Sequence, residues 1–158
     1  MGNIFSAGEV VELGIQIEKN GRDFYGELAA RTDSPGAAEL FKYLAAEEEK
    51  HILVFQKILD KAQAFQPVGL DSGDYYAYMR ALAAEHVFTQ QDKGKELARQ
   101  VKDSAQAVAR GIQAEEESIV FYSGMKKVVP EYGQKVIDEI IAQEAGHLRQ
   151  LLELKKKA

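Results

Sequence analysis

Glu48-Glu49-Lys50-His51 and Glu144-Ala145-Gly146-His147 each place a glutamate and a histidine three residues apart, on one face of a helix. Both pairs interrupt a series of apolar residues that advances in steps of three and four, as on the core-facing side of a bundle helix. The two series are Phe41, Leu44, Glu48, His51, Phe55, Ile58 and Ile137, Ile140, Glu144, His147, Leu151, Leu154. Because burying an unpaired carboxylate costs several kcal/mol, each pair needs a compensating charge, and a metal ion is the simplest source.

An internal repeat extends this pattern to two more helices. Residues 14–25 and 111–122 share Gly, Ile, Gln, Glu, Phe and Tyr at six equivalent places, 97 residues apart, and the Glu/His pairs recur 96 residues apart. Only Glu115, and neither Glu116 nor Glu117, aligns with Glu18. The two halves of the chain are therefore predicted to be copies of one antiparallel helical hairpin, related by a pseudo-two-fold axis.

The chain is predicted to be all-α and to form a single domain over residues 1–158. Long helices are expected near 6–31, 34–64, 104–127 and 130–154, with Ser34 as an N-cap and Pro35 in the first turn. Residues 65–103 read as a long crossover that contains a short helix over 74–88. A polar stretch, 89–103, follows, for which partial helix is one alternative. No alternation of apolar and polar residues is long enough for a strand.

Composition removes several classes of protein. The chain has no Cys, which excludes disulfides, thiolate zinc sites, iron–sulfur clusters and a rubredoxin-type iron site, and is compatible with a reducing cytoplasm. The net charge of −5, with both signs interspersed, argues against nucleic acid as a partner. We find no signal-peptide pattern and no apolar run of about 20 residues, so neither secretion nor a membrane span is expected. A cytoplasmic location is the expectation.

Each of the four long helices is predicted to direct one glutamate inward, and two of them add a histidine. The six candidate metal ligands are Glu18, Glu48, His51, Glu115, Glu144 and His147. Four carboxylates in a dry bundle centre repel one another and should have raised pKa values, whereas two divalent ions would neutralise them. Oxygen-rich ligation with few histidines and no thiolate suits iron or manganese better than structural zinc. The competing interpretation is that these are core polar residues or surface pairs without a metal.

The constellation resembles the rubrerythrin-like branch of the ferritin-like superfamily over essentially the whole chain. The matching motifs are Glu18 with Phe24-Tyr25, Glu48-x-x-His51, Glu115 with Ser118 and Phe121-Tyr122, and Glu144-x-x-His147. The resemblance implies a ferritin-like four-helix bundle. It also implies two iron ions, with manganese or a mixed pair as the alternative, held by the four glutamates and two histidines.

The chain departs from typical rubrerythrins in two places. They end in a Cys-rich rubredoxin domain, which is missing here, so a separate electron-donor protein is expected. They also carry a second Glu one turn after the third-helix ligand, through which an iron moves during peroxide reduction, and here that residue is Ser118. The resemblance implies an oxidoreductase acting on peroxide or dioxygen, in a homodimer or a higher homo-oligomer. The alternatives are a ferroxidase-type iron-handling protein and a non-enzymatic helical module with a vestigial site.

A few further side chains have two interpretations each. Tyr25 and Tyr122 lie two turns after Glu18 and Glu115, and either bond a ligand carboxylate or serve as ordinary core tyrosines. His86 has no partner motif and is expected to be a structural histidine of the crossover. Glu47 could support His51, four residues on, although its counterpart in the repeat is Gln143.

Overall fold

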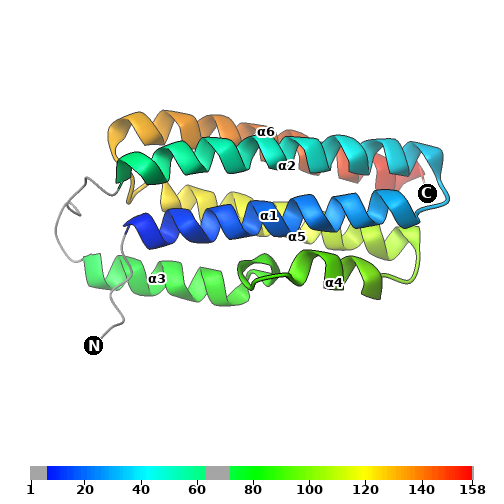
Figure 1. Cartoon of the computed structure of the whole chain (residues 1–158), viewed down its shortest axis with the longest axis horizontal. Helices are drawn as coiled ribbons and strands as arrows, with labels where there is room; N and C mark the ends of the chain where they lie inside the picture. Colours follow the sequence, from blue (N-terminus) through cyan, green and yellow to red (C-terminus); the bar gives the residue numbers. More distant parts are fainter. Residues whose placement is uncertain (1–6, 63–71, 158) are drawn as a thin grey trace.

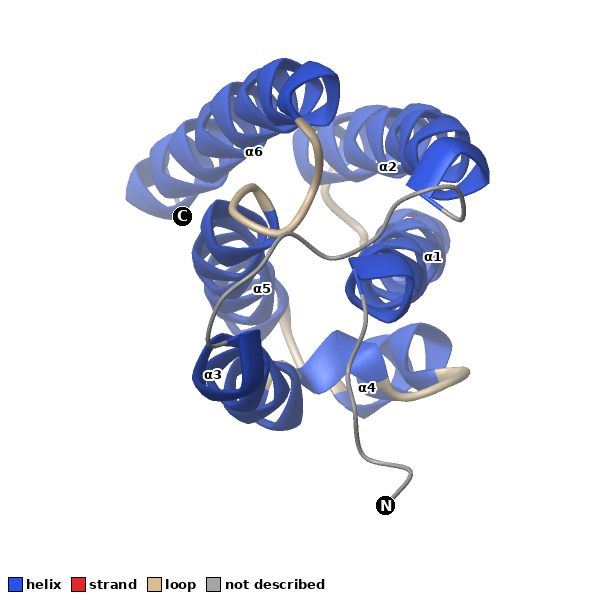
Figure 2. Cartoon of the chain, turned by 90° about the vertical axis from the view of Figure 1, so that its left-hand side faces the viewer, coloured by secondary structure: helices blue, strands red, loops and turns tan. Residues whose placement is uncertain are grey.

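The computed structural model describes residues 7–62 and 72–157. Four long helices dominate it: α1 (Ala7–Arg31), α2 (Pro35–Ala62), α5 (Ser104–Met125) and α6 (Glu131–Lys157). α1 packs along α2 and α5 packs along α6, so the two hairpins of the repeat lie side by side in one bundle (Figure 1). Viewed down the bundle, the four helices surround a common centre, and the described residues contain no strand (Figure 2). The predicted all-α, ferritin-like bundle is confirmed.

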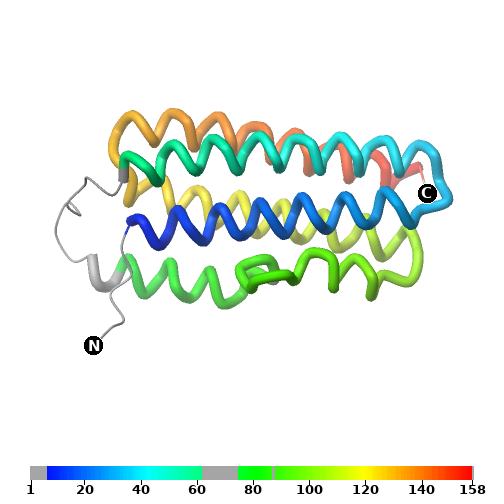
Figure 3. The backbone as a smooth tube through the Cα atoms, in the orientation of Figure 1, coloured from blue at the N-terminus to red at the C-terminus, as the bar shows by residue number. Residues whose placement is uncertain are grey.

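The crossover lies on α1 and α5, on the side of the bundle away from α2 and α6 (Figure 2). It consists of α3 (Ser72–Glu85), a single 3₁₀ turn η1 (Val87–Thr89) and α4 (Lys93–Gln100), which together run the length of the bundle (Figure 3). The polar stretch 89–103 is thus partly helical, one of the two alternatives left open by the sequence.

The short helix expected over 74–88 is present as α3, which is described from Ser72 and stops at Glu85, three residues before the predicted end. His86, the next residue, has an extended backbone (φ −79°, ψ 121°). The Phe88 N–H then donates to Nδ1 of His86 at 3.1 Å, which caps the 3₁₀ turn with an imidazole. The spacing of apolar residues does not reveal a cap made by a side chain, so the end of the helix at Glu85 could not be predicted from periodicity.

Asn20 of α1 anchors the crossover to the bundle. Its buried side chain donates to the carbonyl oxygens of Phe88 and Gln90, both at 2.6 Å, and accepts from the Gly94 N–H at 3.0 Å. A Cβ at Gly94 would collide with the Asn20 carbonyl, so α4 lies directly on the backbone of α1. Glycine is required there by the close approach of two helices.

The helix starts follow ordinary capping chemistry. The Ala37 N–H donates to Ser34 Oγ at 3.3 Å, and the Gln106 N–H donates to the Asp103 carboxylate at 2.8 Å. Both α2 and α5 begin within a residue of where the sequence predicts. Among the described residues, no helix combines the length and the apolar character that crossing a membrane requires.

Candidate metal centre

Six acidic and histidine side chains converge between the four long helices. α1 contributes Glu18, α5 contributes Glu115, and α2 and α6 each contribute a Glu/His pair. All six are buried, none being more than 3% exposed. The apolar residues that precede and follow them on the same helix faces, such as Leu44, Phe55 and Ile137, are buried as well. The sequence pattern therefore located the side chains of the bundle centre correctly.

Donor atoms of these side chains form two overlapping groups, each within 4.8 Å. One group contains Glu18, Glu48, His51 and Glu144, and the other contains Glu48, Glu115, Glu144 and His147. Glu48 and Glu144 belong to both groups, whereas Glu18 with His51 and Glu115 with His147 belong to one each. The groups correspond under the internal repeat. This is the geometry of a two-centre site with two shared carboxylates and one carboxylate and one imidazole at each end.

Both imidazoles direct Nδ1 toward the carboxylates. Nδ1 of His51 lies 3.1 Å from Oε1 of Glu144 and 3.4 Å from Oε1 of Glu18. Nδ1 of His147 lies 3.3 Å from Oε1 of Glu144 and 3.6 Å from Oε1 of Glu48. The two rings are stacked with centroids 5.9 Å apart. Each ring therefore offers one nitrogen to the centre and keeps the other for a partner outside it.

The centre contains buried polar atoms that no protein group satisfies. Hydrogen-bond partners are missing for Glu18 Oε2, Glu48 Oε1, Glu115 Oε2, Glu144 Oε1 and the Nδ1 atoms of both histidines. Buried polar atoms normally have partners, and unmet ones call for a specific explanation. Six such atoms pointing at one another are what two divalent cations with carboxylate and imidazole ligands require. The residues present therefore fit a two-metal carboxylate site.

Gly21 makes room for one of the shared carboxylates. A Cβ at this residue would lie 2.8 Å from Oε2 of Glu48. The glycine is in the interior of α1, where it costs about 1 kcal/mol relative to alanine. The space it leaves is taken up by a ligand-type oxygen, a role that the sequence did not reveal because nothing in it pairs Gly21 with Glu48.

Crowding of the acids changes their proton affinities strongly. Burial, and then the charges of Glu144 and Glu18, raise the pKa of Glu48 well above its usual value. Burial and the charge of Glu144 do the same to the pKa of Glu115. Glu144 differs from the raised values that the sequence predicts: burial raises its pKa, but its contacts with His147 and His51 outweigh burial and lower that pKa to about 2. Burial alone would lower the pKa of His51, but its contacts with Glu144 and Glu18 outweigh burial and raise that pKa to about 11. Without cations, the centre therefore holds protons at neutral pH.

Two tyrosines hold the end carboxylates across the repeat. The Tyr25 hydroxyl of α1 donates to Glu115 Oε1 of α5 at 2.8 Å, and the Tyr122 hydroxyl of α5 donates to Glu18 Oε1 of α1 at 2.7 Å. Both rings are buried, and burial, followed by the charge of the bonded glutamate, raises each tyrosine pKa well above its usual value. Of the two interpretations that the sequence allowed, carboxylate bonding is the one observed.

The outward nitrogen of each histidine faces a residue on the opposite helix. Nε2 of His51 lies 2.6 Å from Oε1 of Gln143, and Nε2 of His147 lies 3.8 Å from Oε1 of Glu47. The sequence offered Glu47 as a support for His51, and the structure instead places it beside His147. An i, i+4 spacing is visible in a sequence, whereas a contact between α2 and α6 is not.

His86 is buried in the crossover and contacts Ser118, one turn after Glu115. Its Nε2 lies 3.1 Å from Ser118 Oγ, and the Ser118 hydroxyl also lies 2.8 Å from the Ala114 carbonyl oxygen. Burial lowers the pKa of His86 to about 4, although the charge of Glu144 acts in the opposite direction, so the ring is neutral at pH 7. The structural role expected from the sequence fits these contacts.

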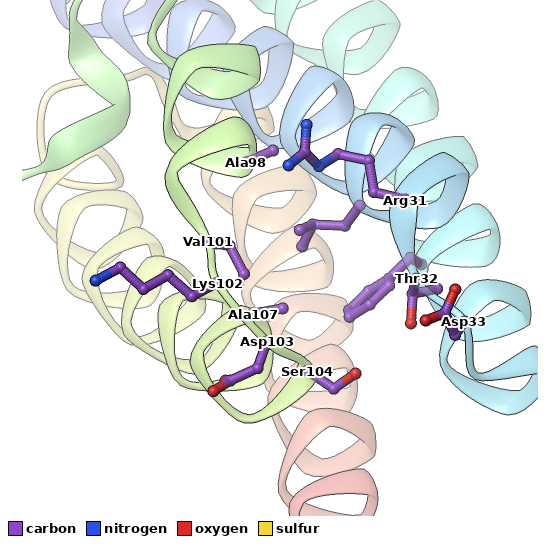
Figure 4. A pocket seen from close by; sticks show the side chains of 11 residues that line it. Arg31, Thr32, Asp33, Ala98, Val101, Lys102, Asp103, Ser104 and Ala107 are labelled. Atoms are coloured by element: carbon purple, nitrogen blue, oxygen red, sulfur yellow. The ribbon is translucent and has the colours of Figure 1, made fainter.

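A surface cavity at one end of the bundle lies apart from this centre. It has a volume of about 330 Å³ and is lined by the α1–α2 turn, the end of α4 and the start of α5. Figure 4 shows Arg31 and Asp33 on one side of the cavity and Val101, Lys102 and Asp103 on the other. None of the six converging residues lines it. We assign it no part in the chemistry of the centre.

The fold of the chain agrees with that of a solved structure. A solved structure from Thermotoga maritima, described as a ferritin-like diiron-carboxylate protein, superimposes with a TM-score of 0.71 at 24% identity, covering 99% of this chain and 98% of that one. No curated protein matches the chain. The family model for rubrerythrin matches residues 9–155, nearly the full length. The chain therefore belongs to the rubrerythrin family.

Proposed function

We propose that the protein is a di-iron oxidoreductase that acts on peroxide or dioxygen and receives electrons from a separate donor protein. The observation that carries the proposal is the convergence of six buried, mostly unsatisfied donor side chains from two repeats. Oxygen-rich ligation without thiolates favours iron or manganese. Membership of the rubrerythrin family favours iron.

In this proposal, Glu48 and Glu144 would contribute to both metal positions, because they belong to both groups of donors. Glu18 and His51 would complete one position, and Glu115 and His147 would complete the other. Two ferrous ions supply two electrons when bound, which is the number that reduction of a peroxide bond consumes. The protein's own part is to fix the donors and to keep water out.

The side chains around the donors are suited to fixing the donors and excluding water. Tyr25 and Tyr122 each hold one oxygen of an end carboxylate, which leaves Oε2 of Glu115 and Oε2 of Glu18 without a protein partner. Phe41, Phe55 and Ile137 close the bundle above and below the donors, and each is at most 1% exposed. A preorganised, dry site of this kind loses little energy to rearrangement when charge changes at its centre.

A second candidate, a ferroxidase-type iron-handling protein with little peroxide turnover, is favoured by one observation. Ser118 stands one turn after Glu115, and its hydroxyl is engaged by the Ala114 carbonyl and by His86. That position therefore offers no additional carboxylate to the centre. The six donors would still hold ferrous iron for oxidation, but the chain would supply no further carboxylate ligand from this position.

Anaerobic loading with ferrous iron, followed by peroxide or air, distinguishes the two candidates. The oxidoreductase predicts two irons per chain and repeated cycling when a reductant is added. The iron-handling protein predicts one round of oxidation, after which turnover stalls or ferric iron is deposited. A chain that binds fewer than two metal ions contradicts both candidates and leaves the non-enzymatic helical module.

A further inference from the structure

The outer nitrogens of the two histidines have chemically different partners. Oε1 of the neutral Gln143 amide lies 2.6 Å from Nε2 of His51. The Glu47 carboxylate faces Nε2 of His147 with Oε1 at 3.8 Å, where the two groups interact electrostatically but form no hydrogen bond, so Nε2 of His147 has no hydrogen-bond partner. Because Nδ1 of each ring points at the centre, a neutral imidazole that binds a cation through Nδ1 carries its proton on Nε2, and that N–H needs an acceptor.

The two partners occupy equivalent places in the repeat. Glu47 immediately precedes Glu48 on α2, and Gln143 immediately precedes Glu144 on α6, 96 residues later. Each reaches across to the histidine of the other helix. The arrangement of the helices therefore keeps the pseudo-symmetry, but the charge does not. The outer nitrogen of one histidine faces a neutral amide, and that of the other faces a carboxylate.

The rest of the centre is nearly symmetric. The tyrosine bonds to the two end carboxylates measure 2.8 Å and 2.7 Å, and each group of donors has three glutamates and one histidine. The Ser118 hydroxyl, which has no counterpart at Gly21, is taken up by Ala114 and His86. Glu47 and Gln143 are thus an equivalent pair that faces the two histidines and differs in charge.

Glu47 is held where its charge acts on His147. Its Oε2 lies 3.0 Å from Nζ of the exposed Lys50, which leaves Oε1 turned toward the ring. The Glu47 side chain is only 13% exposed, so water screens it weakly. A carboxylate beside the N–H of a ligating histidine raises the basicity of the other nitrogen. Partners that are hydrogen-bonded to such a histidine are worth about 10- to 100-fold in metal affinity, and for Glu47 at 3.8 Å we expect the lower end of that range.

We propose that Glu47 is a positioning residue that makes the two metal positions unequal, so that the position containing His147 binds a divalent cation more tightly and fills first. The proposal rests on the two-metal site of the proposed function. The position that contains His51, whose outer nitrogen faces Gln143, would bind the cation more weakly. The expected difference between the two dissociation constants is about tenfold.

Calorimetric titration of the metal-free full chain with Co²⁺ tests the inequality. Wild type should show two resolved steps. Glu47→Gln should weaken the first step about tenfold and bring the two constants together. Gln143→Glu should also make the two dissociation constants more similar, in this case by tightening the second step. In the double variant E47Q/Q143E the two constants should again differ. Circular dichroism and the thermal midpoint of each metal-free variant verify folding, and Gln143 is an exposed residue.

The order of filling is read from the histidine ring signals in NMR spectra of isotope-labelled protein. With one equivalent of Co²⁺, the larger paramagnetic shift, which marks the ligating ring, should appear on His147 in wild type and on His51 in E47Q/Q143E. Glu49→Gln is the matched control, because it removes the same charge from an exposed residue that pairs with Arg22 at 2.8 Å. It should leave both constants and the order unchanged.

Two equal steps in wild type, or unequal steps that Glu47→Gln leaves unchanged, would overturn this inference and leave the two-metal site standing. Binding of fewer than two equivalents of Co²⁺ would instead overturn the proposed function, and this inference with it. A loss in Glu49→Gln as large as in Glu47→Gln would also count against the proposal, because it would show a general effect of surface charge.

Discussion

The hydroxyl of Tyr122 lies 2.7 Å from Oε1 of Glu18, although 104 residues separate them in the chain. Tyr25 and Glu115 form the matching bond at 2.8 Å in the opposite direction across the repeat. Each half of the molecule thus positions a carboxylate of the other half. The bonds tie α1 to α5 at the depth of the metal centre and fix one oxygen of each end glutamate.

Tyr122→Phe removes that bond without changing the shape of the core. We expect the position containing Glu18 to bind Mn²⁺ about 10- to 100-fold more weakly, because an unheld carboxylate must be ordered when the ion binds. Tyr25→Phe should weaken the position containing Glu115 to a similar extent. Calorimetric titration of each variant measures the effect. Tyr78→Phe, at a half-exposed ring of the crossover, is the control, and an equal loss there would contradict the prediction.

Removal of an end carboxylate and removal of a shared one should have different consequences. Glu18→Ala leaves Glu48, Glu115, Glu144 and His147 in place, so one metal ion should remain bound. Glu144→Ala takes a donor from both groups, and we expect both ions to be lost on gel filtration. Metal analysis of the filtered protein gives the stoichiometry. Two ions retained by Glu144→Ala would show that Glu144 does not serve both positions.

Stability should depend on pH differently with and without metal. The folded pKa of His51 is raised from 6.5 to about 11, so its stabilising contribution is complete below pH 6.5 and is lost as pH rises toward 11. The raised pKa values of Glu48 and Glu115 act in the same direction above pH 4.5. We therefore expect the melting temperature of the metal-free protein to fall as pH rises from about 6.5 to 9.

A divalent ion replaces those protons, so the metal-loaded protein should show a flatter profile and the gap between the two forms should widen with pH. Thermal scans at a series of pH values, with chelator or with Mn²⁺, measure both curves. A metal-free protein that gains stability over this range would show that the acids are not crowded as described.

Gly94→Ala tests the contact between α4 and α1. The new methyl group would collide with the Asn20 carbonyl, and we expect a loss of about 1–3 kcal/mol in the free energy of unfolding. Gly26→Ala is the matched control, since a Cβ there meets nothing within 4 Å in the interior of α1, and it should stabilise by up to about 1 kcal/mol. Urea unfolding measures both. A neutral Gly94→Ala would mean that α4 can move away from α1 at little cost.

Most residues of the centre could be predicted from the sequence because they are charged residues at positions where the helix pattern is otherwise apolar. Glu18, Glu48, Glu115 and Glu144 stand where apolar residues belong on amphipathic helices, and the repeat distinguishes Glu115 from its two acidic neighbours. The pairing of Gly21 with Glu48, of His86 with Ser118 and of Glu47 with His147 could not be predicted. Those contacts join segments that are distant in the chain, and they depend on how the helices and the crossover are rotated and shifted against one another.

By itself, the amino-acid sequence determined the four long helices, their duplication and the six residues that face the centre, because periodicity and helix caps act within a few residues along the chain. Only the tertiary structure decided which carboxylates belong to both donor groups, which nitrogen of each histidine faces the centre and which side chain faces the outer nitrogen. These follow from the packing of α1, α2, α5 and α6, in which atoms about 100 residues apart come within 4 Å.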